Sequence, residues 1–159
     1  MIYTMMESPV GPLTIAGESA GLCFILFTAG RRAAGPQPDW IESERGIVRE
    51  TVRQLKAYFA RRLTRFDLPL TPAGTSFQLA VWNELQRIPY GEVISYGELA
   101  RRLGKPRASR AVGAANGANP IPVVVPCHRV IGGDGSLTGY GGGLAIKEAL
   151  LAHERARLF

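Results

Sequence analysis

A cysteine followed directly by a histidine is the clearest candidate for chemistry in this chain of 159 residues. Cys127 lies in the segment Pro126-Cys127-His128-Arg129. A free thiol with a pKa of ~8.5 is only slightly ionised at neutral pH, and a nearby base or positive charge raises the thiolate fraction. His128 is such a base, and Glu154 is the best carboxylate available to orient it. The segment favours a nucleophilic thiol, and a small buried core cysteine is the alternative.

The second cysteine has a different setting. Cys23 lies in the apolar run of residues 22–27, which is typical of a buried core thiol. Counting alone leaves open a disulfide between Cys23 and Cys127, although free thiols are more common in a chain of cytosolic composition.

The composition is that of an ordinary globular protein, with 46% hydrophobic and 20% charged residues. No apolar run approaches the ~20 residues that a membrane-spanning helix needs. Residues 1–12 contain Glu7 and no basic residue, so they do not resemble a signal peptide. We therefore expect a cytoplasmic protein without a membrane partner.

Positive charge is concentrated in one stretch of the chain. Residues 99–133 contain no Asp or Glu, and their six basic residues equal the net charge of +6. These residues are Arg101, Arg102, Lys105, Arg107, Arg110 and Arg129. The stretch is either a solvated basic face or a surface that contacts phosphates, and a suitable shape would favour the second interpretation.

Two short helices are predicted inside this stretch. The capping-box pattern Thr75-Ser76-Phe77-Gln78 first opens a longer helix that ends at residues 88–91. A short helix is then expected over residues 95–104, and a second one over about 107–116. Two short helices joined by a tight Gly-containing turn are typical of the helix-turn-helix of DNA-binding proteins.

The second short helix is built mainly of small residues, and Arg110 is the one long side chain inside it. The small residues are Ala108, Ser109, Ala111, Gly113, Ala114 and Ala115. Such a helix offers little direct reading of bases, but its backbone can approach a surface closely. It either packs against its own core, or it enters a narrow groove with Arg110 inserted toward the base stack. The second interpretation suits a protein that handles one base without reading sequence.

The first part of the chain carries no recognisable chemistry. Strands are predicted over residues 2–6, 13–16 and 22–28, and an amphipathic helix over 43–63. The linker-like residues 71–74 then separate two units, 1–73 and 74–159. In the second unit, Val123-Val124-Val125 has the composition of a short buried strand that leads into the cysteine segment.

The cysteine segment Pro126-Cys127-His128-Arg129-Val130 resembles the active-site signature of the O6-alkylguanine-DNA alkyltransferases (methylated-DNA–protein-cysteine methyltransferases). Further motifs match in order and spacing throughout the second unit. They are Pro89-Tyr90-Gly91-Glu92, Ser95-Tyr96-Gly97, Arg110-Ala111-Val112-Gly113, Asn119-Pro120, Gly139-Tyr140 and Leu151-Ala152-His153-Glu154. The first unit matches more loosely, mainly at Ser8-Pro9-Val10-Gly11-Pro12-Leu13 and Tyr58-Phe59.

The resemblance implies an α/β protein with a small ribonuclease H-like α/β domain over residues 1–73. A mainly helical winged-helix domain, with the helix-turn-helix, follows over 74–159. It also implies direct-reversal DNA repair by a monomer without cofactor. The partner is double-stranded DNA that contains O6-alkylguanine, with O4-alkylthymine as a second substrate. The alkyl group, chiefly methyl, moves irreversibly to Cys127, so each molecule acts once.

The same resemblance implies roles for individual residues. His128, held by Glu154, activates Cys127 through a water, and Asn119 couples the recognition helix to the active-site segment. The recognition helix carries Ala108, Ser109, Ala111 and Gly113 toward DNA. Arg110 fills the space that the rotated base leaves, and Tyr96 promotes rotation and donates to guanine N3. The pocket is formed by Val125, Val130, Tyr140, Gly141 and Pro122, and backbone groups near Val125, Cys127 and Val130 read the guanine edge.

Departures from the family pattern limit these expectations. The chain has only two histidines, His128 and His153, and one cysteine in the first unit, so we expect no structural zinc there. Gly141 stands where some relatives have a serine that contacts O6, which leaves the tolerance for large alkyl groups open. Two other functions remain: a thiol hydrolase, which should turn over repeatedly, and a binder of alkylated bases, which would lack the cysteine.

Overall fold

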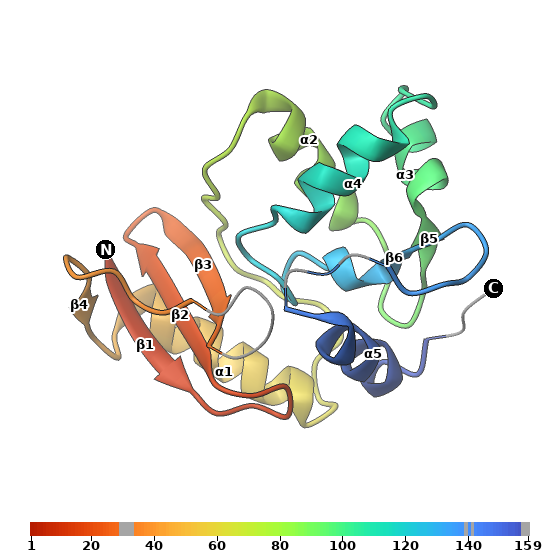
Figure 1. The fold of residues 1–159 in the computed structure, drawn as a ribbon. Coiled ribbons are helices and arrows are strands. Elements are labelled where there is room, and N and C mark those ends of the chain that lie inside the picture. The colour runs from red at the N-terminus through yellow and green to blue at the C-terminus, as the bar shows by residue number, and fades with distance from the viewer. Residues whose placement is uncertain (29–33, 139, 141, 157–159) are drawn as a thin grey trace.

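The computed structural model describes residues 1–28, 34–138, 140 and 142–156. The chain forms a sheet covered by one long helix and then a mainly helical part (Figure 1). The sheet part comprises β1 (Ile2–Met6), β2 (Leu13–Glu18), β3 (Gly21–Phe27), β4 (Ile41–Glu42) and α1 (Gly46–Phe59). The helical part comprises α2 (Ser76–Leu85), β5 (Ile94–Ser95), α3 (Tyr96–Arg102), α4 (Ser109–Gly117), the 3-10 helix η1 (Cys127–Arg129), β6 (Val130–Ile131) and α5 (Leu144–His153). This architecture confirms the predicted α/β fold class.

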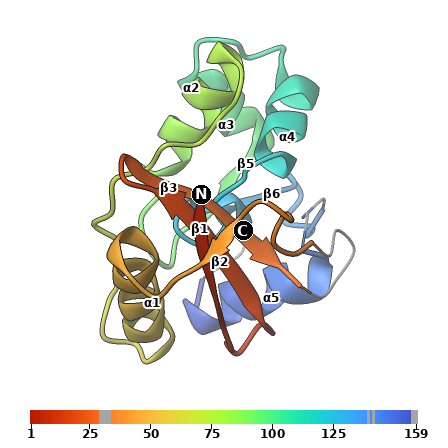
Figure 2. The ribbon, with the colours of Figure 1, turned by 90° about the vertical axis from the view of Figure 1, so that its left-hand side faces the viewer.

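The sheet has the strand order β3-β2-β1-β4, in which β1, β2 and β3 pair antiparallel and β4 runs parallel to β1. Helix α1 covers one face of this sheet (Figure 2). Its buried side chains include Val48 and Leu55 of the predicted apolar stripe, which pack against the core residues of β2. The helix ends at Phe59 rather than at residue 63, because Arg61 adopts a left-handed φ of 62° that the α-helix does not allow.

The two helices predicted in the basic stretch are α3 and α4. The Ser95 hydroxyl caps α3 by accepting from the Glu98 amide, at 3.0 Å. Gly104, with a φ of +70°, lets the chain leave α3 and turn tightly toward α4. Helix α2, which opens with the predicted capping box, packs against both of them. The local signals for caps and turns placed α3 and α4 within about two residues of their observed ends. Helix α2 begins as predicted but ends at Leu85, three residues before the predicted end at residues 88–91.

The strand predicted at Val123-Val124-Val125 is wrong. These residues form a turn, in which the Val125 amide donates to the Ile121 carbonyl at 2.9 Å. Val123 has a φ of 73°, which is incompatible with a strand. The flanking prolines at 120, 122 and 126 have no N–H to donate to a neighbouring strand. The three apolar side chains are explained by their burial in the core rather than by membership of a sheet.

The sheet part and the helical part are packed directly against each other. The Ile25 amide, on the edge strand β3, donates to the Pro120 carbonyl at 3.0 Å. On the other side of the molecule, the Arg61 guanidinium donates to the His153 carbonyl, and a His153 ring nitrogen lies 3.0 Å from the Tyr58 carbonyl. In sequence, the segment that contains Cys127 lies between the Pro120 and His153 junctions, and η1 contacts α5. In the part of the chain that the structure describes, no helix has the length and apolarity needed to span a membrane.

Candidate active site

Cys127 is the first residue of the one-turn helix η1 and is 5% exposed. Its thiol is free, and so is the thiol of Cys23, which is buried as predicted for a core cysteine. Burial raises the pKa of Cys127, although interactions with Asn119 and the Lys147 charge oppose this increase. The thiol is therefore neutral at pH 7 in the free protein, and a nucleophilic reaction requires a group that removes its proton.

Cys127 forms part of the wall of a cavity of about 190 Å³. Residues from β3, from the end of α4 and from the segments after it line this cavity. They are Ile25, Leu26, Phe27, Asn116, Gly117, Ala118, Asn119, Pro120, Pro122, Cys127, Tyr140 and Gly142. The sheet part thus supplies one wall, which the sequence did not suggest. The mostly apolar lining suits a small, largely apolar group that presents a reactive atom to the sulfur.

Two of the five predicted pocket residues, Pro122 and Tyr140, line this cavity. Val125 and Val130 are buried beside it but are not part of its wall. Gly141 lies outside the described residues, as does Gly139. Burial raises the pKa of Tyr140, and its hydroxyl interacts with the Cys127 thiol in the same cavity wall.

His128 is completely buried, and its Nε2 lies 2.8 Å from Glu154 Oε2. Burial lowers the pKa of His128 even though Glu154 raises it, so the imidazole is neutral at pH 7. A neutral ring that donates its Nε2–H to the carboxylate keeps a lone pair on Nδ1. Within the described residues, this Nδ1 has no hydrogen-bond partner. His128 therefore has the protonation state and the tautomer that a general base requires.

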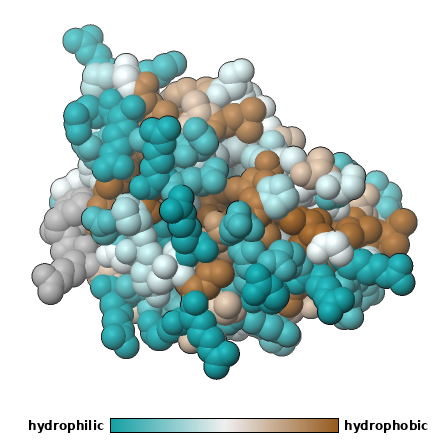
Figure 3. Space-filling view, turned by 180° about the vertical axis from the view of Figure 1, so that it is seen from behind, coloured by the Kyte–Doolittle hydropathy of each residue, from teal (hydrophilic) through white to brown (hydrophobic). Residues whose placement is uncertain are grey.

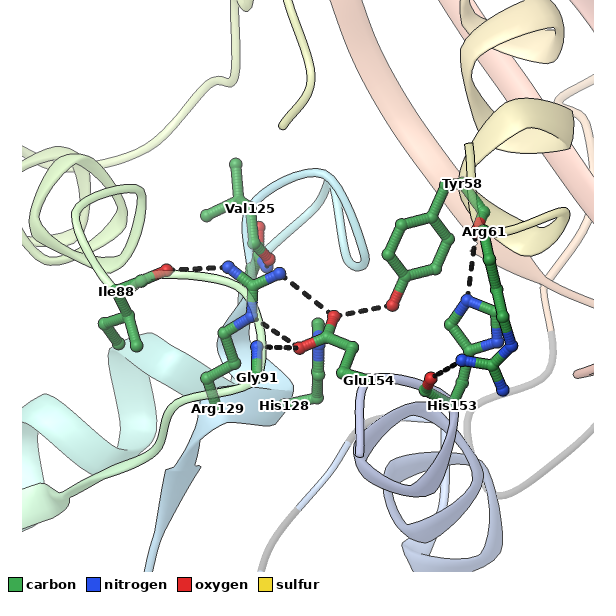
Figure 4. A network of polar contacts seen from close by, with 10 residues as sticks. Tyr58, Arg61, Ile88, Gly91, Val125, His128, Arg129, His153 and Glu154 are labelled. Atoms are coloured by element: carbon green, nitrogen blue, oxygen red, sulfur yellow. Dashed lines mark hydrogen bonds and ion pairs between the residues drawn. The ribbon is translucent and has the colours of Figure 1, made fainter. Parts of the chain in front are cut away.

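Glu154 is the centre of a buried polar network (Figure 4). Arg129 donates from Nε to Glu154 Oε1 at 2.8 Å and from Nη2 to Oε2 at 2.9 Å. The Tyr58 hydroxyl donates to Oε2 at 2.6 Å, and the Gly91 amide to Oε1 at 3.4 Å. Burial alone would raise the pKa of Glu154, but the hydrogen bonds and charges of His128 and Arg129 lower it well below its usual value. Glu154 is thus a fixed anion that orients His128.

The network corrects the expectation that Arg129 belongs to a phosphate-contacting surface. Arg129 is 6% exposed, and besides the two bonds to Glu154 its side chain donates from Nη1 to the Ile88 carbonyl at 2.6 Å. A guanidinium with these partners is not available to DNA. Arg129 lies in η1 immediately after His128, so the one-turn helix directs both side chains toward Glu154.

Asn119 and Asn116 fix the backbone around Cys127. The Asn119 amide nitrogen donates to the Val125 carbonyl at 2.8 Å, and its Oδ1 accepts from the Ile121 amide at 3.0 Å. Asn119 therefore joins the end of α4 to the turn before Cys127, although that turn is not the predicted strand. Asn116 Nδ2 donates to the carbonyl of Cys127 itself at 3.3 Å.

Lys147 is a buried amine on α5, close to the site. Its Nζ donates to the Val130 carbonyl at 2.6 Å and to the Thr138 carbonyl at 2.8 Å. Burial lowers its pKa to about 8, although the charge of a Cys127 thiolate would raise it. The Tyr96 hydroxyl donates to the same Thr138 carbonyl at 3.1 Å. Burial raises the pKa of Tyr96, so this hydroxyl keeps its proton at neutral pH.

The helix pair presents a basic, exposed side. Arg110 and Ala111 on α4 are exposed, and Ala108, Ser109 and Gly113 are partly buried. A Cβ added at Gly113 would lie 3.7 Å from the Tyr96 ring, so α4 and Tyr96 are in close contact. Hydrophilic residues dominate the helical part where it is seen from behind (upper left of Figure 3). The predicted DNA-contacting residues of α4 thus lie beside α3, which α4 contacts directly.

Only part of the predicted positive charge is free on this surface. Arg101 and Arg102 pair with Glu98 of the same helix, which precedes the acid-free stretch by one residue. Lys105, Arg107 and Arg110 are exposed and form no ion pair with a carboxylate of the described residues. These three cations are the ones available for phosphates.

Sequence reasoning missed four residues of the site: Tyr58, Asn116, Arg129 and Lys147. Lys147 stands in the apolar stripe of α5, three residues after Leu144 and seven before Glu154, and this position was a signal of burial. Arg129 was counted as a surface charge because it lies in a basic stretch. No sequence signal connects Tyr58 to Glu154, which follows it by 96 residues.

Family models match both parts of the chain. Residues 1–72 match the ribonuclease-like domain of 6-O-methylguanine DNA methyltransferase, and residues 76–156 match its DNA binding domain. A methylated-DNA–protein-cysteine methyltransferase of Methanosarcina acetivorans is 53% identical over 154 residues, 97% of this chain and 98% of the relative. A protein of the same name from Mycolicibacterium paratuberculosis is 51% identical over 96% of this chain and 92% of its own.

The fold is similar to solved structures as well. The crystal structure of Mycobacterium tuberculosis OGT in complex with DNA superposes with a TM-score of 0.89 at 48% identity, covering 98% of this chain and 93% of that chain. An O6-methylguanine-DNA methyltransferase from Pyrococcus kodakaraensis superposes with a TM-score of 0.68 at 26% identity, over 96% of this chain and 98% of that chain. The sheet part and the part that carries Cys127 are both included in these similarities.

Proposed function

The chain belongs to the 6-O-methylguanine DNA methyltransferase family, and on that premise we propose that Cys127 is the residue that accepts the alkyl group. Members of this family are methylated-DNA–protein-cysteine methyltransferases of DNA repair, and the chain is an enzyme of this kind. The observation that carries the proposal is a buried free thiol at the wall of a cavity, directly followed in sequence by a neutral imidazole that a buried carboxylate orients.

The reaction transfers the alkyl group of O6-alkylguanine in double-stranded DNA to the sulfur of Cys127. The thiol proton passes to Nδ1 of His128 through a water, while Glu154 stabilises the imidazolium that results. The sulfur forms a bond to the alkyl carbon as the bond from that carbon to O6 breaks, and the electron pair moves to the guanine. The proton finally returns to the guanine, so atoms and charges balance.

Neighbouring groups support this step. Tyr96 keeps its proton at neutral pH, so its hydroxyl can exchange the Thr138 carbonyl for guanine N3 and donate to it as negative charge develops on the base. Lys147 carries a positive charge in the vicinity of Cys127 and stabilises a thiolate. The product is a thioether, which no group near the sulfur can cleave. Each molecule therefore acts once.

The base reaches the cavity by rotation out of the duplex, because O6 is not accessible to a buried sulfur inside the base stack. The small residues of α4 allow its backbone to approach the DNA, and Arg110 fills the space in the stack. Lys105 and Arg107 contact phosphates beside it. O4-alkylthymine is the second substrate. We further propose a cytoplasmic monomer that needs no cofactor or metal and whose domains divide at residues 73 and 74.

Mass spectrometry of the intact protein tests the acceptor. After incubation with a duplex that contains O6-methylguanine, we expect the mass to increase by one methyl group, at Cys127 and at one equivalent per protein. Cys127→Ser should acquire no label, and Cys23→Ser should be labelled as the wild type is. Repeated turnover, or a label on another residue, would overturn the proposal.

Arg110→Ala tests base rotation. We expect the transfer rate of the variant on duplex DNA to fall about tenfold or more. Rotating a base out of the stack costs a few kcal/mol, and in the variant no side chain fills the space that the base leaves. Its reaction with free O6-benzylguanine should change little, since that substrate needs no rotation. Equal losses on the two substrates would show that Arg110 acts on something other than the stack.

A further inference from the structure

A second and larger cavity borders the cysteine segment. It is a groove of about 900 Å³, lined by residues 64–70, by residues 83–90 at the end of α2 and after it, and by part of the cysteine segment. Val124, Pro126 and Arg129 line this groove, whereas Pro122 and Cys127 line the smaller cavity. The two linings share no residue. The segment of residues 122–129 therefore separates two distinct sites.

The groove has an apolar and partly aromatic lining. Ile88 and Val124 are buried there, and Phe66 and Tyr90 are half-buried, so their rings border the groove without being fully covered. The volume of the groove lies in the range of roughly 300–1,000 Å³ that is usual for sites of small molecules. A flat ring in the groove can pack against these aromatic side chains.

The polar side chains of the groove carry only positive charge. Asn83, Gln86 and Arg87 are exposed at the end of α2, and Arg65 comes from the wall that the sheet part supplies. No carboxylate lines the groove in the part of the chain that the structure describes. The two amide side chains offer both donors and acceptors, and the guanidinium groups offer donors alone.

Two of the three arginines that line the groove are available to a ligand. The charge of Arg129 is compensated by Glu154. Arg65 forms no ion pair with a carboxylate of the described residues. Arg87 lies 3.6 Å from Glu84, with its side chain 72% exposed, and such exposed pairs contribute little. An anion in the groove can therefore take the place of Glu84 at little cost.

We propose that this groove binds an anion of the size of a mononucleotide. Its phosphate pairs with Arg65 and Arg87, because guanidinium groups match phosphate oxygens in charge and geometry. Its ring packs against Phe66 and Tyr90. A phosphate alone leaves the apolar lining unused, and an apolar molecule leaves both guanidinium groups unused. The site goes beyond the proposed function, since it lies outside the cavity of Cys127 and needs no alkyl transfer.

Calorimetric titration with adenosine monophosphate tests the site, and adenosine and inorganic phosphate are titrated separately. The nucleotide should bind about tenfold more tightly than either, because only the nucleotide joins both contacts in one molecule. Arg65→Gln and Arg87→Gln should each weaken nucleotide binding about fivefold, as for one exposed charge pair. Arg49→Gln removes the same charge from an exposed position of α1 outside the groove, and should bind the nucleotide as the wild type does.

The reaction with free O6-benzylguanine locates the bound nucleotide. Saturating adenosine monophosphate should not compete with this substrate for Cys127, because the groove and the cavity share no lining residue. Competition would place the nucleotide in the cavity of Cys127. A loss of binding in Arg107→Gln as large as that in Arg65→Gln would place it on the surface of the helix pair. Either result would overturn the inference.

Three further results of the titrations would also overturn it. They are no binding of the nucleotide, inorganic phosphate that binds as tightly as the nucleotide, and an equal loss of binding in Arg49→Gln and Arg65→Gln. None of these results bears on the proposed function, which the methyl label at Cys127 tests separately.

Discussion

Glu98 and Glu154 are both carboxylates with two basic partners, and they differ in solvent and in sequence distance. Glu98 accepts from Arg101 and Arg102, which lie three and four residues further along α3, and all three side chains are open to water. Glu154 accepts from Arg129 and His128, which lie 25 and 26 residues earlier, in a site closed to water. In both cases basic partners lower the pKa of the carboxyl group.

Although the pKa values of Glu98 and Glu154 are shifted in the same direction, the two carboxylates contribute very differently to stability. In an exposed group, water replaces a lost partner at little cost, so the Glu98 pairs contribute little to stability. In a buried group, a lost partner leaves an uncompensated charge, so each member of the Glu154 network depends on the others. The Glu154 network also reaches the sheet part, because Tyr58 donates to Glu154 from α1. The buried carboxylate connects the two parts of the molecule, and the exposed one connects residues of a single helix.

Glu154→Gln should have the largest effect. The variant keeps the shape of the side chain but leaves the buried Arg129 without its counter-ion, which we expect to reduce the free energy of unfolding by about 3–5 kcal/mol. Methyl transfer should also slow, since His128 loses the acceptor that fixes its tautomer. Urea denaturation at pH 7 and single-turnover rates measure both effects. A loss of less than about 1 kcal/mol, within the range of exposed pairs, would contradict the comparison.

The pH dependence of this loss has a definite sign. The folded pKa of Glu154 lies below the value of about 4.3 that a glutamate has in an unfolded chain. Its contribution to stability is therefore complete above about pH 4.3 and disappears as the pH falls toward the folded pKa. The difference between wild type and Glu154→Gln should shrink in urea titrations below that pH. A constant difference would show that the carboxylate is not the ionised group.

Tyr58→Phe should have an intermediate effect. It removes one hydrogen bond to a buried anion and leaves the ring packing, so we expect a loss of about 1.5–3 kcal/mol. Tyr90→Phe is a matched control, because the Tyr90 ring contacts Tyr58 and Arg129 while its hydroxyl bonds to none of the described residues. Equal losses in the two variants, measured by urea denaturation, would show that the Tyr58 hydroxyl does not support Glu154.

The comparison also explains which parts of the molecule could be predicted from the sequence. The capping box of α2 and the positions of α3 and α4 depend on neighbours within a few residues, so local patterns revealed them closely. The end of α1 was predicted four residues too late, at residue 63 instead of Phe59. The pairing of Arg101 and Arg102 with Glu98 is equally local. It was missed because the acid-free stretch was defined as beginning at residue 99, one residue after Glu98. The contact between Tyr58 and Glu154 depends on how the two parts pack, and no local pattern encodes it.

Local patterns also failed to predict which polar side chains are buried and which apolar runs form strands. Arg129 lies in a basic stretch, and only the direction of η1 shows that its charge is used inside the protein. Val123 lies in an apolar run that suits a buried strand, and only its neighbouring prolines exclude one. The family resemblance suggested the contact of His128 with Glu154 before the structure showed the two atoms 2.8 Å apart. It did not suggest Asn116, whose position depends on the cavity.

Glu98→Gln should have the smallest effect on stability and a distinct effect on DNA binding. Arg101 and Arg102 remain solvated without the carboxylate, so thermal unfolding should be unchanged within error. The two arginines then become free to contact phosphates beside Lys105 and Arg107, and the affinity for undamaged duplex DNA should rise. Each additional phosphate that the protein neutralises should steepen the dependence of log K on log salt by about 0.9.

Glu84→Gln is the control for net charge, because it removes the same charge from an ion pair between Glu84 on α2 and Arg87 just after the helix. An equal rise in DNA affinity in both variants would mean that net charge alone acts, and that Glu98 has no special relation to the DNA surface. A rise in DNA affinity that is confined to Glu98→Gln and disappears at high salt would instead show that Glu98 limits DNA binding by holding two arginines away from phosphates. Glu154, by contrast, supports the chemistry at Cys127. The two carboxylates would then differ in function for the same reason that they differ in stability, which is their access to water.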